Sequence, residues 1–149
     1  MNNFDFFVGN WTAVNRRLLR VFDGCTEWDE FPSTSRCWNV FDGAGNFDEI
    51  TFPTKGYQGA TLRLYDEKTE EWSLYWANTR VGLTMPPQVG RFDENGRGEF
   101  YADDVYEGRP VRVVYIWTSS PDSPRWEQAF SADGGETWET NWTMQFTRV

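Results

Sequence analysis

A small set of polar side chains falls among the aromatic residues of strand-like segments, and these are the residues that could do chemistry. The set is Asn15, Arg17, Arg36, Asp48, Asn78 and Gln128. A buried polar group needs a partner, because an unpaired buried charge is costly. In one interpretation, Arg17 or Arg36 pairs with Asp48 and the amides bind one another or ordered water. In the other, the set forms the polar end of a pocket that orients a carboxylate, carbonyl or phenol.

Three residues of this set, together with Glu49 and Tyr115, could also act as catalytic groups. Asp48 or Glu49 would act as a buried general base, while Arg17 or Arg36 would stabilise a developing enolate. Tyr115 would donate the proton. A cyclase, isomerase or dehydratase needs little more than a shaped pocket and one acid or base. The sequence therefore carries an enzymatic alternative beside a binding one.

Composition excludes several classes of site. The chain has no histidine, which rules out a histidine-ligated haem or zinc, a Ser-His-Asp triad and a histidine general base. Its net charge of −9 argues against a nucleic-acid or anionic-membrane surface, which needs clustered Lys and Arg. Two faint calcium-like loops, at Asp93 and Asp133, lack the later bidentate glutamate. We therefore expect no metal and no cofactor.

The first residues have neither a basic start nor an apolar core, so we expect no secretory segment, and no apolar run approaches the roughly 18 residues that span a membrane. We therefore predict a cytoplasmic protein in which Cys25 and Cys37 are reduced. A disulfide between them is the alternative. At 149 residues, the chain is predicted to form one domain over residues 1–149.

Strand-like segments recur every 10 to 15 residues, separated by Asn-Gly, Asp-Gly and Gly-Gly turns that favour tight hairpins. Pro32 should force a break or an edge position in the second of them. The expected strands cover 8–19, 26–31 with 35–40, 47–52, 61–65, 71–78, 89–92, 98–101, 111–117, 126–130 and 137–149. About ten antiparallel strands in up-and-down order would leave two raw edges unless the sheet closes. We predict an all-β barrel with an internal cavity, and a two-sheet sandwich is the alternative.

Side chains alternate along a strand, so each strand has one inward face. We place Trp11, Ala13, Asn15 and Arg17 inside, and elsewhere we choose the more apolar face. That choice gives Leu62, Leu64, Trp72, Leu74, Trp76, Asn78, Phe100, Ala102, Val111, Val113, Tyr115, Trp117, Trp126, Gln128, Phe130, Trp138, Trp142, Met144 and Phe146. In the second and third strands, the preferred inward face consists of Arg36, Trp38 and Val40 with Asp48, Ile50 and Phe52. The alternative inward face consists of Cys37, Asn39 and Glu49.

The segment from Ser131 to Trp138 matches the Asp-box turn of sialidase-type propeller blades. In this turn an aspartate accepts backbone N–H groups, glycine takes the left-handed position and a tryptophan covers the hairpin. The chain is too short for a propeller, which needs several blades of roughly forty residues. We interpret the motif as a turn device.

Gly9-x-Trp11 on the first strand, with Arg148 near the end of the last, resembles the calycin superfamily, which includes lipocalins and fatty-acid-binding proteins. The resemblance extends over the full length to bacterial lipocalin-like barrels of the cytoplasm. It implies that the arginine packs over the tryptophan at the closed end and that the barrel holds a small, largely apolar molecule.

The leading hypothesis is a barrel that binds a small hydrophobic or aromatic molecule without chemistry. The predicted ligand-binding residues are Asn15, Arg17, Arg36, Trp38, Asp48, Trp76, Asn78, Tyr115, Trp117, Trp126, Gln128 and Trp142. The enzymatic alternative uses Asp48, Glu49, Arg17, Arg36 and Tyr115. A third hypothesis is a homodimer whose exposed tryptophans form the interface.

Overall fold

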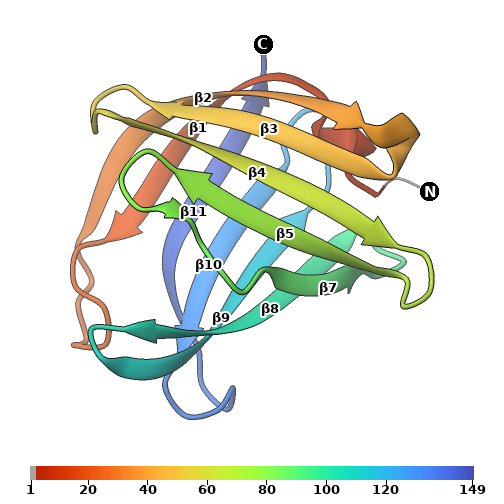
Figure 1. Cartoon of the computed structure of the whole chain (residues 1–149). Helices are drawn as coiled ribbons and strands as arrows, with labels where there is room; N and C mark the ends of the chain where they lie inside the picture. Colours follow the sequence, from red (N-terminus) through yellow and green to blue (C-terminus); the bar gives the residue numbers. More distant parts are fainter. Residues whose placement is uncertain (1–2) are drawn as a thin grey trace.

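Consecutive antiparallel hairpins build one continuous sheet in the computed structural model, which describes residues 3–149 (Figure 1). Two short 3₁₀ turns, η1 (Asp5–Phe7) and η2 (Phe41–Gly43), accompany the strands. The strands are β1 (Gly9–Leu18), β2 (Trp28–Val40), β3 (Gly45–Phe52), β4 (Tyr57–Asp66), β5 (Glu71–Asn78), β6 (Gly82–Leu83), β7 (Gln88–Phe92), β8 (Arg97–Tyr106), β9 (Arg109–Thr118), β10 (Arg125–Ser131) and β11 (Glu139–Arg148).

The sheet closes into an up-and-down barrel of ten strands, as the sequence predicts. β1 pairs with β2 on one side and with β11 on the other, where Trp11 lies opposite Arg148. β4 pairs with β5 to complete the ring, and the two-residue β6 adds a short flap to β5. Closure leaves the wall without raw edges. The two-sheet sandwich is therefore wrong.

β2 is continuous through Pro32, so the predicted break does not occur. Pro32 pairs with Val14 of β1, whereas β3 begins to pair with β2 only at Thr34. One side of β2 is thus unpaired at Pro32. A proline that lacks an N–H is tolerated at such an edge position.

An aromatic plug closes one end of the barrel. Phe4, which precedes η1, and Phe7, the last residue of η1, are fully buried, and Phe7 stacks on Trp11 with ring centroids 5.4 Å apart. The Trp11 indole N–H donates to the Phe7 carbonyl at 2.7 Å. Arg148 lies 4.1 Å from the Trp11 ring and donates to the carbonyls of Val8 and Phe6. The predicted packing of arginine over tryptophan is confirmed.

The alternation of buried residues follows the predicted inward face on β5, β8 and β9 and on most of β1, β10 and β11, although Arg17 is exposed and Phe130 is half-buried. Three corrections are needed. On β4, Arg63 is buried and Leu62 and Leu64 face outward. On β2, Cys37 is inside while Arg36 and Trp38 are outside, although Asp48, Ile50 and Phe52 of β3 are inside as preferred.

The third correction concerns Trp138, which lies on the outer surface in the Asp-box turn. Asp133 accepts the backbone N–H groups of Glu136 and Thr137, and Trp138 donates its indole N–H to the Gly135 carbonyl. The Trp138 ring contacts Tyr101, with centroids 5.9 Å apart. The interpretation of this motif as a turn device is confirmed.

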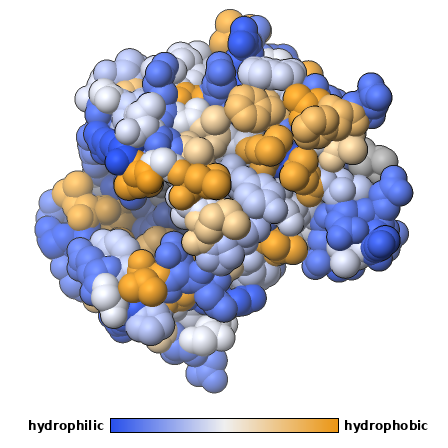
Figure 2. All heavy atoms as spheres, in the orientation of Figure 1, coloured by the Kyte–Doolittle hydropathy of each residue, from blue (hydrophilic) through white to orange (hydrophobic). Residues whose placement is uncertain are grey.

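The outer face of β2–β5 carries an apolar row, which explains why the inward face of β4 is hard to predict. The register places Trp38 opposite Phe47, Phe47 opposite Leu62, and Leu62 opposite Tyr75. Figure 2 shows hydrophobic side chains gathered over β3 and β4 on this side. Both faces of β4 are therefore partly apolar. Within residues 3–149, no helix is long and apolar enough to cross a membrane.

Candidate functional site

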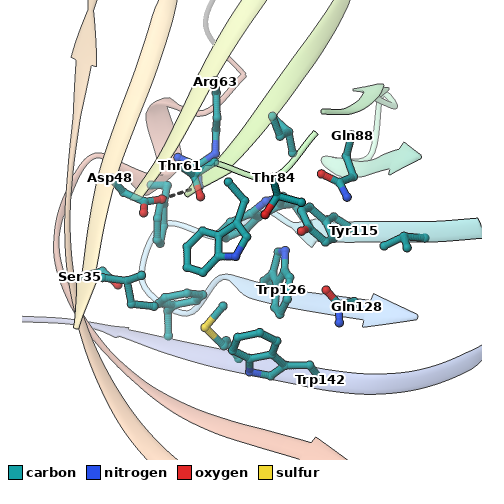
Figure 3. Close-up of a pocket in the computed structure, with 18 of the residues that line it drawn as sticks. Ser35, Asp48, Thr61, Arg63, Thr84, Gln88, Tyr115, Trp126, Gln128 and Trp142 are labelled. Carbon is teal, nitrogen blue, oxygen red and sulfur yellow. Dashed lines mark hydrogen bonds and ion pairs between the residues drawn. The ribbon is translucent and has the colours of Figure 1, made fainter. Parts of the chain in front are cut away.

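A pocket of about 210 Å³ extends inside the barrel from the aromatic plug toward the opposite end (Figure 3). Phe7, Trp117 and Phe146 line its floor. Arg17 and Asp104, near the far ends of β1 and β8, line it at the mouth. The pocket exists because the plug fills only one end of a ten-stranded barrel, which is wider than the roughly eight-stranded size that side chains can fill.

Aromatic side chains from neighbouring strands form one wall of the pocket. Tyr115 of β9 contacts Trp126 of β10 with ring centroids 5.2 Å apart, and Trp126 meets Trp142 of β11 edge to face at 5.3 Å. The Trp142 indole N–H donates to Asn15 at 3.0 Å, and Asn15 donates to Ser33 at 2.9 Å. These hydrogen bonds hold the wall in place.

Trp76 of β5 forms the facing wall and lies against the backbone of β4. A Cβ added to Gly59 would come within 2.1 Å of the Trp76 ring. Gly59 pairs with Asn78 of β5, so the indole of Trp76 occupies the space that a side chain at position 59 would fill. The absence of a side chain there lets the six-membered ring of the indole approach the β4 backbone closely.

A buried ion pair joins the floor to the wall. Arg63 is 2% exposed and Asp48 is 5% exposed, and the Arg63 guanidinium donates to Asp48 and to Asn46. The same guanidinium lies 4.9 Å from the Phe4 ring and 5.4 Å from the Trp117 ring. The charges of Arg63 and Asp48 compensate each other, which a buried pair requires. This pairing corresponds to the interpretation in which Asp48 binds an arginine, but with Arg63 in place of Arg17 or Arg36.

Several polar groups that line the pocket have no hydrogen-bond partner among the residues that the structure describes. Gln88 is 4% exposed and Ser35 is 8% exposed. Neither side chain makes a hydrogen bond to any residue in the described range, 3–149, and the Tyr115 hydroxyl makes none there either. Burial raises the pKa of Tyr115 above its usual range, with the Asp104 charge adding to the shift and Arg17 opposing it. Tyr115 therefore presents a neutral hydroxyl to the pocket.

The mouth carries one charge of each sign. Arg17 lies 4.4 Å from the Trp142 ring and forms no ion pair with any residue that the structure describes. Asp104 accepts only the backbone N–H of Val105 within the same residues. Both side chains are exposed, so water solvates them.

The structure places the predicted site residues in three groups. Arg17, Asp48, Trp76, Tyr115, Trp117, Trp126, Gln128 and Trp142 line the pocket. Asn15 lies behind the wall, bonded to Trp142, and Asn78 accepts the backbone N–H groups of Arg80 and Val81 in the turn after β5. Arg36, Trp38 and Glu49 lie outside the barrel, where Arg36 pairs with Glu49 at 3.7 Å and lies over Trp38 at 4.8 Å.

Sequence reasoning missed Arg63, Gln88, Ser35, Thr61, Thr84 and Asp104, which also line the pocket. Arg63 was missed because Leu62 and Leu64 make the other face of β4 more apolar. The glycine at position 59, opposite a tryptophan-rich strand, was an available signal for the inward face. Gln88 had no signal, since its position depends on how the flap between β5 and β7 returns to the wall.

No protein-family model matches this sequence, and no curated protein matches it either. The closed antiparallel barrel, with Trp11 beneath Arg148, is consistent with a calycin-like fold. Residues 3–149 contain no group of three or more His, Cys, Asp and Glu that could hold a metal ion. The chemistry of the site is therefore inferred from the pocket itself.

Proposed function

We propose that this protein is a calycin-like barrel that binds a small, largely apolar or aromatic molecule in its pocket. The observation that carries the proposal is the pocket between Trp76 and the wall of Tyr115, Trp126 and Trp142. Binding sites for small molecules are mostly apolar with a few placed polar groups, and this pocket has that composition. The two free cysteines, Cys25 and Cys37, suit a reducing compartment, and we propose a cytoplasmic location.

Binding is favoured over catalysis because the proposed catalytic residues are not assembled. Glu49 and Arg36 pair with each other outside the barrel, away from the pocket. Asp48 already accepts a hydrogen bond from Arg63, so its charge is compensated. Arg17 and Tyr115 line the pocket, and the described residues place no free carboxylate base in its buried part. The enzymatic alternative stays a prediction.

The dimer hypothesis also stays a prediction. The apolar row of Trp38, Phe47, Leu62 and Tyr75 is the surface that an interface would use. Size-exclusion chromatography at several concentrations tests it. A concentration-independent monomer contradicts it.

Intrinsic tryptophan fluorescence tests the binding proposal, because Trp76, Trp126 and Trp142 line the pocket. We expect compact aromatic molecules such as naphthalene to quench or shift this fluorescence with saturation. A Thr61→Phe variant, which fills the pocket from β4, should abolish the response, whereas Trp38→Phe on the outer face should retain it. The absence of any saturable response across a broad panel of apolar and aromatic molecules contradicts the proposal.

A further inference from the structure

The unpaired polar groups inside the pocket indicate which molecules it can hold. Only 4% of the Gln88 surface is exposed, yet its side-chain amide has no hydrogen-bond partner among residues 3–149. The Tyr115 side chain is half-buried, and its hydroxyl also has no hydrogen-bond partner among these residues. Figure 3 shows both side chains at the pocket. A buried amide offers one acceptor and two donors, and a phenol offers one donor and an acceptor. A ligand that fills this space must satisfy them.

An aliphatic chain fits these groups poorly. Covering an unpaired buried polar group with apolar surface lowers affinity by roughly five- to 150-fold for each group that stays unpaired. The pocket volume, about 210 Å³, is also below the roughly 300–1,000 Å³ of sites for drug-sized molecules. A ligand of one or two rings fits this volume better than a long chain does. The aromatic wall further favours a ring, because aromatic pairs gain from edge-to-face and offset contacts.

Among residues 3–149, the lining of the pocket offers no free counter-ion to a buried ligand charge. The buried charges of Arg63 and Asp48 compensate each other. The remaining charges that line the pocket, Arg17 and Asp104, are of opposite sign and lie exposed at the mouth. Burying an ionised group without a partner costs more than the apolar contacts return. The part of the ligand that enters the pocket is therefore neutral.

We propose that the ligand is an uncharged, planar molecule of one or two rings that carries both a hydrogen-bond donor and an acceptor, which the Gln88 amide and the Tyr115 hydroxyl recognise. This inference rests on the proposed function, since it names the class of molecule that the same pocket holds. Gln88 and Tyr115 are then the residues that determine specificity, and the tryptophans supply the apolar contact.

Four probes of similar size separate the possibilities. Quinolin-2(1H)-one has a lactam N–H and carbonyl on two fused rings, naphthalene is its apolar counterpart, 2-naphthoate adds a negative charge, and decanoate is an aliphatic acid. Dissociation constants come from fluorescence titration and calorimetry on the full chain. We expect quinolin-2(1H)-one to bind at least tenfold more tightly than each of the other three.

Two variants assign the preference to the named residues. Gln88→Leu should weaken quinolin-2(1H)-one about tenfold while leaving naphthalene unchanged or tighter. Tyr115→Phe removes only a hydroxyl and tests the second residue even if Gln88→Leu fails to fold. Gln58→Leu, on the exposed outer side of β4, is the matched control and should change neither constant.

The outcomes distinguish this inference from the binding proposal. If naphthalene binds but quinolin-2(1H)-one shows no preference, or if 2-naphthoate or decanoate binds most tightly, the pocket is a ligand site and this inference is wrong. A preference that survives both Gln88→Leu and Tyr115→Phe also overturns it. If no probe binds to the wild type, the binding proposal fails and the inference fails with it.

Discussion

Aromatic residues play opposite roles at the two ends of the barrel. At the closed end, Phe7 stacks on Trp11, Phe4 and Phe7 both pack on Trp117, and the polar atoms of Trp11 and Arg148 all find backbone carbonyls. In the pocket, Trp76 and Trp126 leave space beside them, and Gln88 and Tyr115 lack partners among residues 3–149. An aromatic ring therefore stabilises the fold where its neighbours surround it and forms a binding surface where they do not.

The largest effect is expected at the closed end. Trp11→Ala should lower the free energy of unfolding by about 4 kcal/mol, because it leaves a large cavity beneath Arg148 and removes the hydrogen bond to Phe7. Urea denaturation followed by circular dichroism measures the change. Trp11→Phe keeps a ring and should cost clearly less. A loss below about 2 kcal/mol for Trp11→Ala would mean that the plug is not a main source of stability.

The ion pair between the two ends gives the next effect. Arg63→Met should destabilise the barrel by about 3 kcal/mol, because it leaves the Asp48 carboxylate buried without its partner. The double variant Arg63→Met with Asp48→Leu removes both charges and should recover most of the loss. If the double variant is as unstable as the single one, packing on Phe4 and Trp117, rather than charge pairing, makes Arg63 important.

The two cysteines report how well each region excludes solvent. Burial raises the pKa of Cys37 to about 11, and its thiol donates to Asn46, whereas Cys25 is half-buried in the loop after β1. At pH 8 only roughly one Cys37 in a thousand is then a thiolate, the form that reacts. We expect a disulfide reagent to label Cys25 at least a hundredfold faster than Cys37. Equal rates, measured with Cys25→Ser and Cys37→Ser variants, would show that the wall opens readily.

A substitution in the wall of the pocket should reduce ligand affinity more than it reduces the stability of the fold. Trp126→Leu keeps an apolar side chain but removes an indole that contacts Tyr115 and Trp142. We expect about a tenfold weaker affinity for naphthalene, and a smaller change in unfolding free energy than Trp11→Ala produces. Parallel titration and denaturation of both variants measure the contrast. A Trp126→Leu variant that binds naphthalene as well as the wild type does would exclude Trp126 from the binding surface.

The smallest effect lies outside both regions, in the Asp-box turn. Hydrogen bonds from the Thr137 side chain and backbone, and from Ser131, hold the pKa of Asp133 well below its usual range. A carboxylate whose pKa is lowered by folding stabilises the fold above its unfolded pKa, about 3.9, and this contribution is lost as the pH falls below that value. Asp133→Asn should thus be less stable than the wild type at pH 7, with the difference shrinking below about pH 4. A difference that is independent of pH would contradict the assignment.

The order of the strands was predictable because each hairpin carries its own turn signal, and closure followed from the two raw edges that an open sheet of about ten strands would leave. The inward faces were harder. The rule that the more apolar face points inward fails on β4, where Leu62 continues an apolar row on the outside while Arg63 enters the core to meet Asp48. That pairing joins two strands, so neither strand's own sequence reveals it.

The pocket was predictable only in its aromatic part. Trp76, Trp126 and Trp142 lie on the more apolar face of their strands, so their inward direction follows from the chain. Gln88 depends on the path of the flap after β5, and Arg36 was misplaced because both faces of β2 mix polar and apolar residues. Local patterns fix a side chain's direction only where one face is plainly less polar.

Gly59 affects the width of the pocket, although it is not among the residues that line it. The space left by its missing methyl group is where the Trp76 indole rests. A single carbon atom added there would push the indole away from the wall, and the interior would narrow without any change to a residue that touches a guest. The width of the barrel interior thus depends on the lack of a side chain at Gly59, in the wall behind Trp76.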